Sequence, residues 1–114
     1  MTREIEHLKG LDLIVEERLR QVEDLGYTVE HDADCTSVAE LMRISQCYIE
    51  VAAEESEGND VSHYFYPSVK PGRWPRGTSI PWRPEQTPME NAAKGAAFAA
   101  AALDLMNAEL RGEV

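Results

Sequence analysis

The sequence predicts an all-α fold, with three main helices and one long ordered loop in a single domain that covers residues 1–114. Two stretches with apolar residues at helical spacing and an alanine-rich C-terminal stretch lead to this prediction. A further observation separates the last two helices, because all six prolines and both tryptophans lie between residues 58 and 88. Proline excludes a long helix and a central strand there, so residues 58–87 are predicted to form the loop.

The first helix is predicted over about residues 3–25. Thr2 suits the N-cap position, and Gly26 suits the position just past the C-terminal end. One stripe of apolar residues at three- and four-residue steps is expected to be buried, namely Ile5, Leu8, Leu11, Val15, Leu19 and Val22. Residues 27–36, which follow, are predicted to form an acidic connection.

The second helix is predicted over about residues 38–55. Ser37 and Glu40 have the spacing of a capping box, and Gly58 ends the helical pattern. The side chains expected to face inward are Val38, Leu41, Met42, Ser45, Tyr48, Ile49 and Ala52.

The third helix is predicted over about residues 88–111. Thr87 is a suitable N-cap, Pro88 suits the first helical position, and Gly112 suits the end. The stripe expected to be buried is Met89, Ala92, Ala96, Ala100, Leu103, Met106 and Leu110. Small residues at every fourth position allow two helices to approach closely, so a homo-oligomer packed around this helix is expected.

The charge of the chain is −10 and is unevenly distributed. Residues 1–60 hold sixteen acidic and five basic side chains, whereas residues 61–88 carry Lys70, Arg73, Arg76 and Arg83 against Glu85 alone. An acidic body repels phosphates and therefore argues against direct binding of nucleic acid. It is compatible with a local anion site on the loop, or with carboxylates that face a basic protein partner.

The loop combines aromatic and basic side chains. Aromatic rings stack on bases and guanidinium groups bind phosphates, so this mixture favours a nucleotide-derived ligand. The alternative is a basic loop that lies across the acidic helices, with its tryptophans filling gaps in the core. Tyr64, Phe65 and Tyr66 belong to this mixture, and the predicted ligand-binding residues are Arg73, Trp74, Arg76, Trp82 and Arg83, assisted by Arg18 or Lys94.

Two groups of residues raise the question of a metal ion. Glu30, His31, Asp32 and Cys35 are of metal-binding type, but their spacing matches no recognised zinc or calcium loop. The alternative is that the carboxylates make turn and capping bonds while the histidine packs or pairs with Arg18. A magnesium site needs carboxylates from neighbouring helices, and a paired motif is missing among its candidates Glu16, Glu17, Glu23, Glu40 and Asp104. No catalytic residue and no cofactor is therefore predicted, with magnesium or zinc kept as alternatives.

The expected location is the cytoplasm. The longest apolar stretch, residues 95–103, is far shorter than the roughly 20 residues of a membrane span. The N-terminus lacks the pattern of a secretory signal, so Cys35 and Cys47 are expected to be reduced thiols.

A family resemblance covers about residues 17–106. The stretch Arg20-Gln21-x-Glu23-x-x-Gly26-Tyr27, followed by Glu30-His31-Asp32, resembles a small family of uncharacterised phage and prophage proteins. Cys35 stands where that family has a second histidine, and Asp104 stands where it has a glutamate. Further matches are Glu40-Leu41, Cys47-Tyr48, Trp74-Pro75, Trp82-Arg83-Pro84 and Lys94-Gly95-Ala96.

The resemblance implies a phage or prophage origin and supplies no established activity. The function predicted from it and from the loop is that of a phage accessory protein, with a possible anti-defence role, which binds a nucleotide-like ligand. Two alternatives remain open. One is an acidic inhibitor of a host nucleic-acid-binding defence enzyme, and the other is a magnesium-dependent nucleotide pyrophosphohydrolase.

Overall fold

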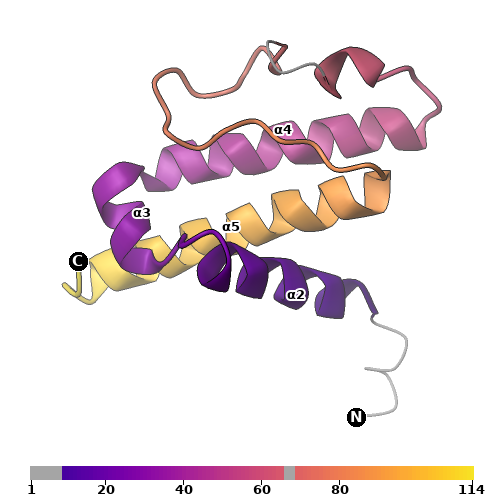
Figure 1. The fold of residues 1–114 in the computed structure, drawn as a ribbon. Coiled ribbons are helices and arrows are strands. Elements are labelled where there is room, and N and C mark those ends of the chain that lie inside the picture. Colours follow the sequence, from indigo (N-terminus) through magenta and orange to yellow (C-terminus); the bar gives the residue numbers. More distant parts are fainter. Residues whose placement is uncertain (1–8, 66–68) are drawn as a thin grey trace.

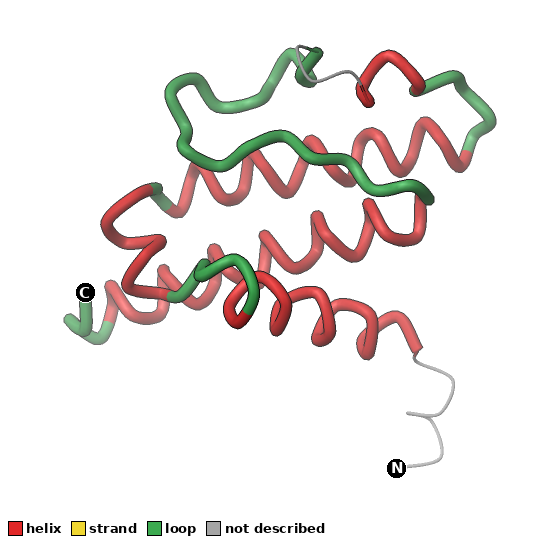
Figure 2. Tube along the Cα trace, in the orientation of Figure 1, coloured by secondary structure: helices red, strands yellow, loops and turns green. Residues whose placement is uncertain are grey.

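The fold is all-α, as predicted, in the computed structural model of the chain, which describes residues 9–65 and 69–114. The elements are the α-helices α2 (Lys9–Glu23), α3 (Val29–Cys35), α4 (Val38–Ser56) and α5 (Pro88–Leu110), and the short 3₁₀-helix η1 (Ser62–Phe65). These described residues contain no strand. Figures 1 and 2 show α4 and α5 side by side and antiparallel, with α2 crossing α5 and the loop lying along the helices.

The predicted helix ends are confirmed where the structure describes them. Thr87 Oγ1 and Ser37 Oγ each accept a hydrogen bond from the backbone N–H three residues later, at 3.1 Å. Gly26 and Gly112 follow α2 and α5 with φ angles of 75° and 68°, in the left-handed region that favours glycine. The predicted start of the first helix, including Thr2, Ile5 and Leu8, lies outside the described residues, as does Tyr66.

The acidic connection predicted over residues 27–36 is wrong, because Val29–Cys35 form α3. Thr28 caps this helix through its hydroxyl, which accepts from the backbone N–H of His31 at 3.1 Å. Glu30 and Asp32 lie in the first turn, where the helix dipole stabilises negative charge. The acidic composition that suggested a connection therefore favours the start of a short helix.

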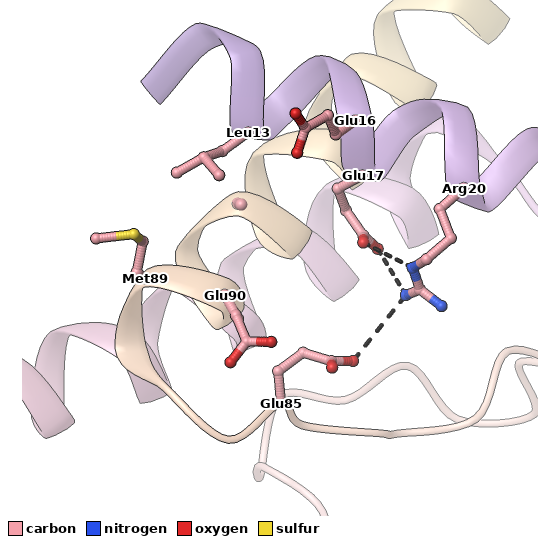
Figure 3. A pocket seen from close by; sticks show the side chains of 8 residues that line it. Leu13, Glu16, Glu17, Arg20, Glu85, Met89 and Glu90 are labelled. Atoms are coloured by element: carbon pink, nitrogen blue, oxygen red, sulfur yellow. Dashed lines mark hydrogen bonds and ion pairs between the residues drawn. The ribbon is translucent and has the colours of Figure 1, made fainter. Parts of the chain in front are cut away.

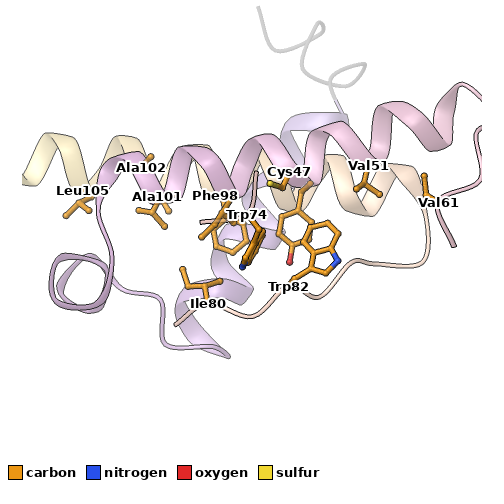
Figure 4. Close-up of a cluster of buried hydrophobic side chains, with 13 residues drawn as sticks. Cys47, Val51, Val61, Trp74, Ile80, Trp82, Phe98, Ala101, Ala102 and Leu105 are labelled. Atoms are coloured by element: carbon orange, nitrogen blue, oxygen red, sulfur yellow. The ribbon is translucent and has the colours of Figure 1, made fainter. Parts of the chain in front are cut away.

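The hydrophobic core joins α4, α5 and the loop (Figure 4). Tyr48 of α4 is fully buried and stacks on Phe98 of α5, with ring centroids 5.7 Å apart and planes inclined by 8°. The ring of Tyr48 also contacts the rings of Trp82 and Trp74, with centroid distances of 4.5 Å and 6.0 Å. Both tryptophans and Ile80 of the loop are buried, so the loop supplies a substantial part of the core.

The predicted inward faces of the first and third helices are wrong for the single chain. Leu11, Val15 and Leu19 are more than half exposed, while Gln21 of the same helix is buried. On α5 the stripe from Met89 to Leu110 is largely exposed, and the buried residues are Asn91, Lys94, Gly95, Ala97, Phe98, Ala101, Ala102, Leu105 and Ala108.

Hydrogen bonds to the loop explain why α5 buries a different face from the predicted one. Asn91 Oδ1 accepts from the backbone N–H of Glu85 at 2.7 Å, and Lys94 Nζ donates to the carbonyl of Arg83 at 2.6 Å. An apolar side chain at either position would leave these loop groups unpaired. On α4 the prediction holds for Leu41, Ser45, Tyr48 and Ala52, which are buried, and fails for Met42 and Ile49, which are exposed.

Gly95 is where α4 and α5 approach most tightly. A Cβ atom there would lie 2.7 Å from Ile49 Cγ1 and 2.9 Å from the backbone oxygen of Ser45. Gly95→Ala is therefore expected to lower the free energy of unfolding by about 1–3 kcal/mol, because overpacking forces backbone shifts. Urea unfolding followed by circular dichroism measures the change. Gly10→Ala is the matched control, since no described residue lies within 4 Å of its added methyl group, and alanine there is expected to be neutral or stabilising. Equal stability of the Gly95→Ala variant and the wild type would contradict this packing.

Among the described residues, no helix is both long enough and apolar enough to cross a bilayer.

Candidate functional site

Among the described residues, the ion pairs that join the loop to the helices are made by Glu85 and not by the cations of the loop. Glu85 Oε2 lies 2.7 Å from Lys94 Nζ of α5 and 4.0 Å from Arg20 Nη2 of α2. Among the described residues, Lys70 and Arg83 of the loop make no ion pair. No carboxylate of the described helices therefore pairs with these two cations. The tryptophans do fill the core, as the alternative interpretation of the sequence predicted.

The two tryptophans are parts of the core. Trp82 is 8% exposed, and its Nε1–H donates to the carbonyl of Tyr64 at 2.9 Å. Trp74 is 7% exposed, and its Nε1 has no hydrogen-bond partner among the residues that the structure describes. Their ring faces contact Tyr48 and one another, with 5.3 Å between the two tryptophan centroids. Neither ring face is open for stacking on a ligand.

A groove lies between η1 and the loop segment 81–86. It encloses about 560 Å³. We call it the aromatic groove, and its lining is Tyr64, Phe65, Lys70, Pro81, Trp82, Arg83, Pro84 and Gln86. Phe65, Lys70 and Arg83 are exposed, Tyr64 is half-buried, and Trp82 contributes only the small part of its ring that reaches the surface. Burial raises the pKa of Tyr64, so its hydroxyl stays protonated at neutral pH.

The backbone of Arg83 is held from two sides. Its N–H donates to the hydroxyl of Tyr48 at 3.0 Å, and its carbonyl accepts from Lys94 Nζ at 2.6 Å. Burial raises the pKa of Tyr48 far above its usual range, so this hydroxyl is protonated at every physiological pH. The side chain of Arg83 thus starts from a fixed backbone, is exposed, and lines both the aromatic groove and a smaller cavity beside Tyr27.

The other predicted ligand-binding residues lie outside this groove. Arg18 donates to Asp104 Oδ2 from Nη2 at 3.1 Å and to the carbonyl of Tyr27 at 3.1 Å, so it joins α2 to α5. Lys94 is buried and bonded to the loop. Arg73 and Arg76 are exposed elsewhere on the loop.

A second pocket, of about 450 Å³, has acidic walls (Figure 3). Arg20 lies between its carboxylates and donates to both oxygens of Glu17 at 2.8 Å, while Glu90 accepts from Thr87 Oγ1 at 2.9 Å. These bonds occupy most of the carboxylates that a cation would need. The lining is Leu13, Glu16, Glu17, Arg20, Glu85, Met89, Glu90 and Ala93.

The candidate metal ligands are not brought together. Asp32 is buried, with Oδ1 3.0 Å from His31 Nδ1, whereas Glu30 and Cys35 point to solvent. Within residues 9–65 and 69–114, no three His, Cys, Asp or Glu side chains are placed to share a metal ion. Cys47 belongs to the core, where burial raises the pKa of its thiol to about 11, so it is a protonated apolar side chain at neutral pH.

Comparisons with known proteins give no relative. The chain matches no protein-family model, no curated protein and no solved structure. The aromatic groove therefore has to be interpreted from its own chemistry.

Only Trp82 and Arg83 of the eight lining residues belong to the predicted ligand-binding set. Tyr64, Phe65 and Lys70 are part of the loop's aromatic and basic mixture, but no local signal shows that η1 folds back beside residue 82. The hydrogen bond from Trp82 Nε1 to the carbonyl of Tyr64 creates this arrangement, and it joins residues that are 18 positions apart.

Proposed function

We propose that the protein binds a small anionic ligand with an aromatic ring, of the nucleotide type, in the aromatic groove. One observation carries the proposal: Lys70 and Arg83, which make no ion pair with any described residue, line a groove of about 560 Å³ together with aromatic side chains. Ligand pockets for small molecules typically enclose about 300–1,000 Å³, so a nucleotide fits this space.

The residues of the groove suit the two halves of such a ligand. Phe65 and the half-buried ring of Tyr64 offer apolar surface to a base. Arg83 offers a planar guanidinium for bidentate bonds to a phosphate, and Lys70 offers a second positive charge. Because the backbone of Arg83 is already fixed by Tyr48 and Lys94, little conformational freedom is lost there on binding.

The net negative charge of the protein disfavours binding of an anion to most of its surface. With a net charge of −10, most of the surface repels an anionic ligand, and the basic loop is the exception. The described lining of the groove offers no carboxylate, histidine or thiol for acid–base or nucleophilic chemistry. These features favour binding over conversion, and the resemblance to phage proteins favours sequestration of a host nucleotide signal as the purpose.

The first test is isothermal titration calorimetry with a panel of ATP, GTP, cyclic AMP and cyclic dinucleotides. At least one member is expected to bind, and Arg83→Gln is expected to weaken it about 10- to 100-fold, because a hydrogen bond to a charged group contributes about 1.5–3 kcal/mol. Arg76→Gln is the matched control, since Arg76 is an exposed cation of the same loop outside the groove. It is expected to change affinity less than about twofold, as a surface position without contacts.

Three outcomes would reject the proposal or change its site. Absence of binding at millimolar concentration for the whole panel would reject it. Equal losses in both variants would show a diffuse electrostatic attraction, and a loss with Arg76→Gln alone would move the site along the loop. Recovery of an altered nucleotide in the presence of Mg²⁺ would favour the pyrophosphohydrolase instead.

A further inference from the structure

The helices expose large apolar side chains on the side that faces away from the loop. The six that define this apolar face are Leu11, Val15 and Leu19 of α2, Met42 and Ile49 of α4, and Leu103 of α5. Leu103, for example, is 61% exposed. Such a concentration of exposed apolar residues on one side marks an interaction surface.

Helix periodicity places these residues on the same side. Successive residues of an α-helix are about 100° apart, so Leu103 lies roughly 140–160° round α5 from Phe98 and Leu105, which face the core under the loop. On α4, Met42 and Ile49 are turned away in the same manner from Ile44 and Val51. On α2, Val15 and Leu19 are each two positions from Glu17, which lies on the side of loop residue Glu85.

The described part of the chain is thin. Its principal extents are 44 × 44 × 22 Å. A helix with its side chains is about 10 Å across, so 22 Å accommodates the helical layer and the loop. Among the described residues, the core lies between these two layers, and the apolar side chains on the other side of the helices stay exposed.

We propose that the apolar face binds the same face of a second copy of this chain. Two copies that each carry −10 repel one another unless the contact is uncharged. The stripe of α5 fulfils this condition, since the exposed Ala92 and Leu103 and the half-buried Ala96 and Ala100 carry no charge. At its border, the charges of Arg18 and Asp104 neutralise each other at 3.1 Å.

The face combines small and large side chains. Ala92, Ala96 and Ala100 lie on α5, which contacts both α4 and α2, and α2 exposes Val15 and Leu19. In the proposed dimer, a twofold rotation packs Val15 and Leu19 of one copy against the alanines of the other. The 23 residues of α5 span about 34 Å, and two interhelical spacings add about 18 Å, which gives roughly 600 Å² per copy. That area approaches the 800 Å² or so per partner of a standard stable interface.

Sedimentation equilibrium of the full chain at micromolar concentration tests the proposal. The expected mass is twice 12.8 kDa. Leu103→Glu and Leu19→Glu are each expected to weaken the dimer by at least about 100-fold, because each buries an unpaired charge at the contact. Both residues are exposed in the single chain, so circular dichroism is expected to show unchanged helix content.

The matched control is Phe65→Glu, which adds the same charge at an exposed apolar residue on the loop side. It is expected to leave the dimer intact while it impairs the aromatic groove. Conversely, Leu103→Glu is expected to retain nucleotide binding, so this inference and the proposed function fail independently. A wild-type chain that is monomeric at 100 µM would overturn the proposal and assign the face to a different protein. A Leu103→Glu dimer as tight as the wild type would overturn it as well.

Discussion

Trp82→Ala is expected to lower the free energy of unfolding by about 3–5 kcal/mol, the usual cost of truncating a buried tryptophan. The ring lies 4.5 Å from Tyr48 and 5.3 Å from Trp74 between centroids, and its Nε1–H donates to the carbonyl of Tyr64. Removing it opens a cavity between the loop and α4 and frees η1 from segment 81–86. Urea unfolding followed by circular dichroism at 222 nm measures the loss without relying on tryptophan fluorescence.

A graded control separates the cavity from the hydrogen bond. Trp82→Phe keeps most of the ring volume but loses the bond to Tyr64, so a smaller loss of about 1–2 kcal/mol is expected. If Trp82→Ala were instead as stable as the wild type but unable to bind nucleotides, the tryptophan would be an exposed stacking surface. The packing of the loop described above would then be incorrect.

Lys94→Met is expected to lower the free energy of unfolding by about 2–3 kcal/mol. The ammonium group is buried and donates to Glu85 Oε2 and to the carbonyl of Arg83, both on the loop. Loss of one partner of a fully buried ion pair costs about 3–5 kcal/mol, and the partial exposure of Glu85 reduces that figure here. The same unfolding measurement applies, and Lys70→Met, at an exposed lysine of the loop, is expected to change stability by less than about 0.5 kcal/mol.

A double-mutant cycle shows whether the pair itself is responsible. Adding Glu85→Gln to Lys94→Met is expected to cost about 1 kcal/mol less than the sum of the single variants, because the two side chains share one interaction. Strict additivity would mean that Lys94 stabilises the fold only through the carbonyl of Arg83.

Local signals in the sequence were sufficient for the main helices. Capping hydroxyls and left-handed glycines act within one turn of the chain, so Ser37, Thr87, Gly26 and Gly112 could be assigned correctly. Thr28 is a signal of the same kind, and the acidic residues around it obscured the start of α3. These features depend only on neighbours in sequence.

The orientation of the helices could not be predicted, because it depends on partners far along the chain. Asn91 and Lys94 lie outside the predicted buried stripe, yet their bonds to Glu85 and Arg83 bring them inside. On α2, Leu11 and Val15 were predicted to be buried, and in the single chain they are more than half exposed. The second copy proposed above would cover them. The aromatic groove depends on the fold in the same way, since the bond from Trp82 to Tyr64 brings its two walls together.

The connection between α4 and α5 is much longer than the distance between the two helix ends requires. Asn91 Nδ2 at the start of α5 donates to Glu55 Oε1 at the end of α4 at 3.1 Å, so the two helix ends are neighbours. Antiparallel helices this close are ordinarily joined by a turn of about two to five residues. The chain uses residues 57–87 instead and touches the helices mainly through Trp74, Ile80, Trp82 and Glu85. The stretches between those anchor points, such as the exposed turn at Gly77, are therefore free to change in length and composition during evolution. The exposed lining of the aromatic groove can thus change while the packing of the helices is kept.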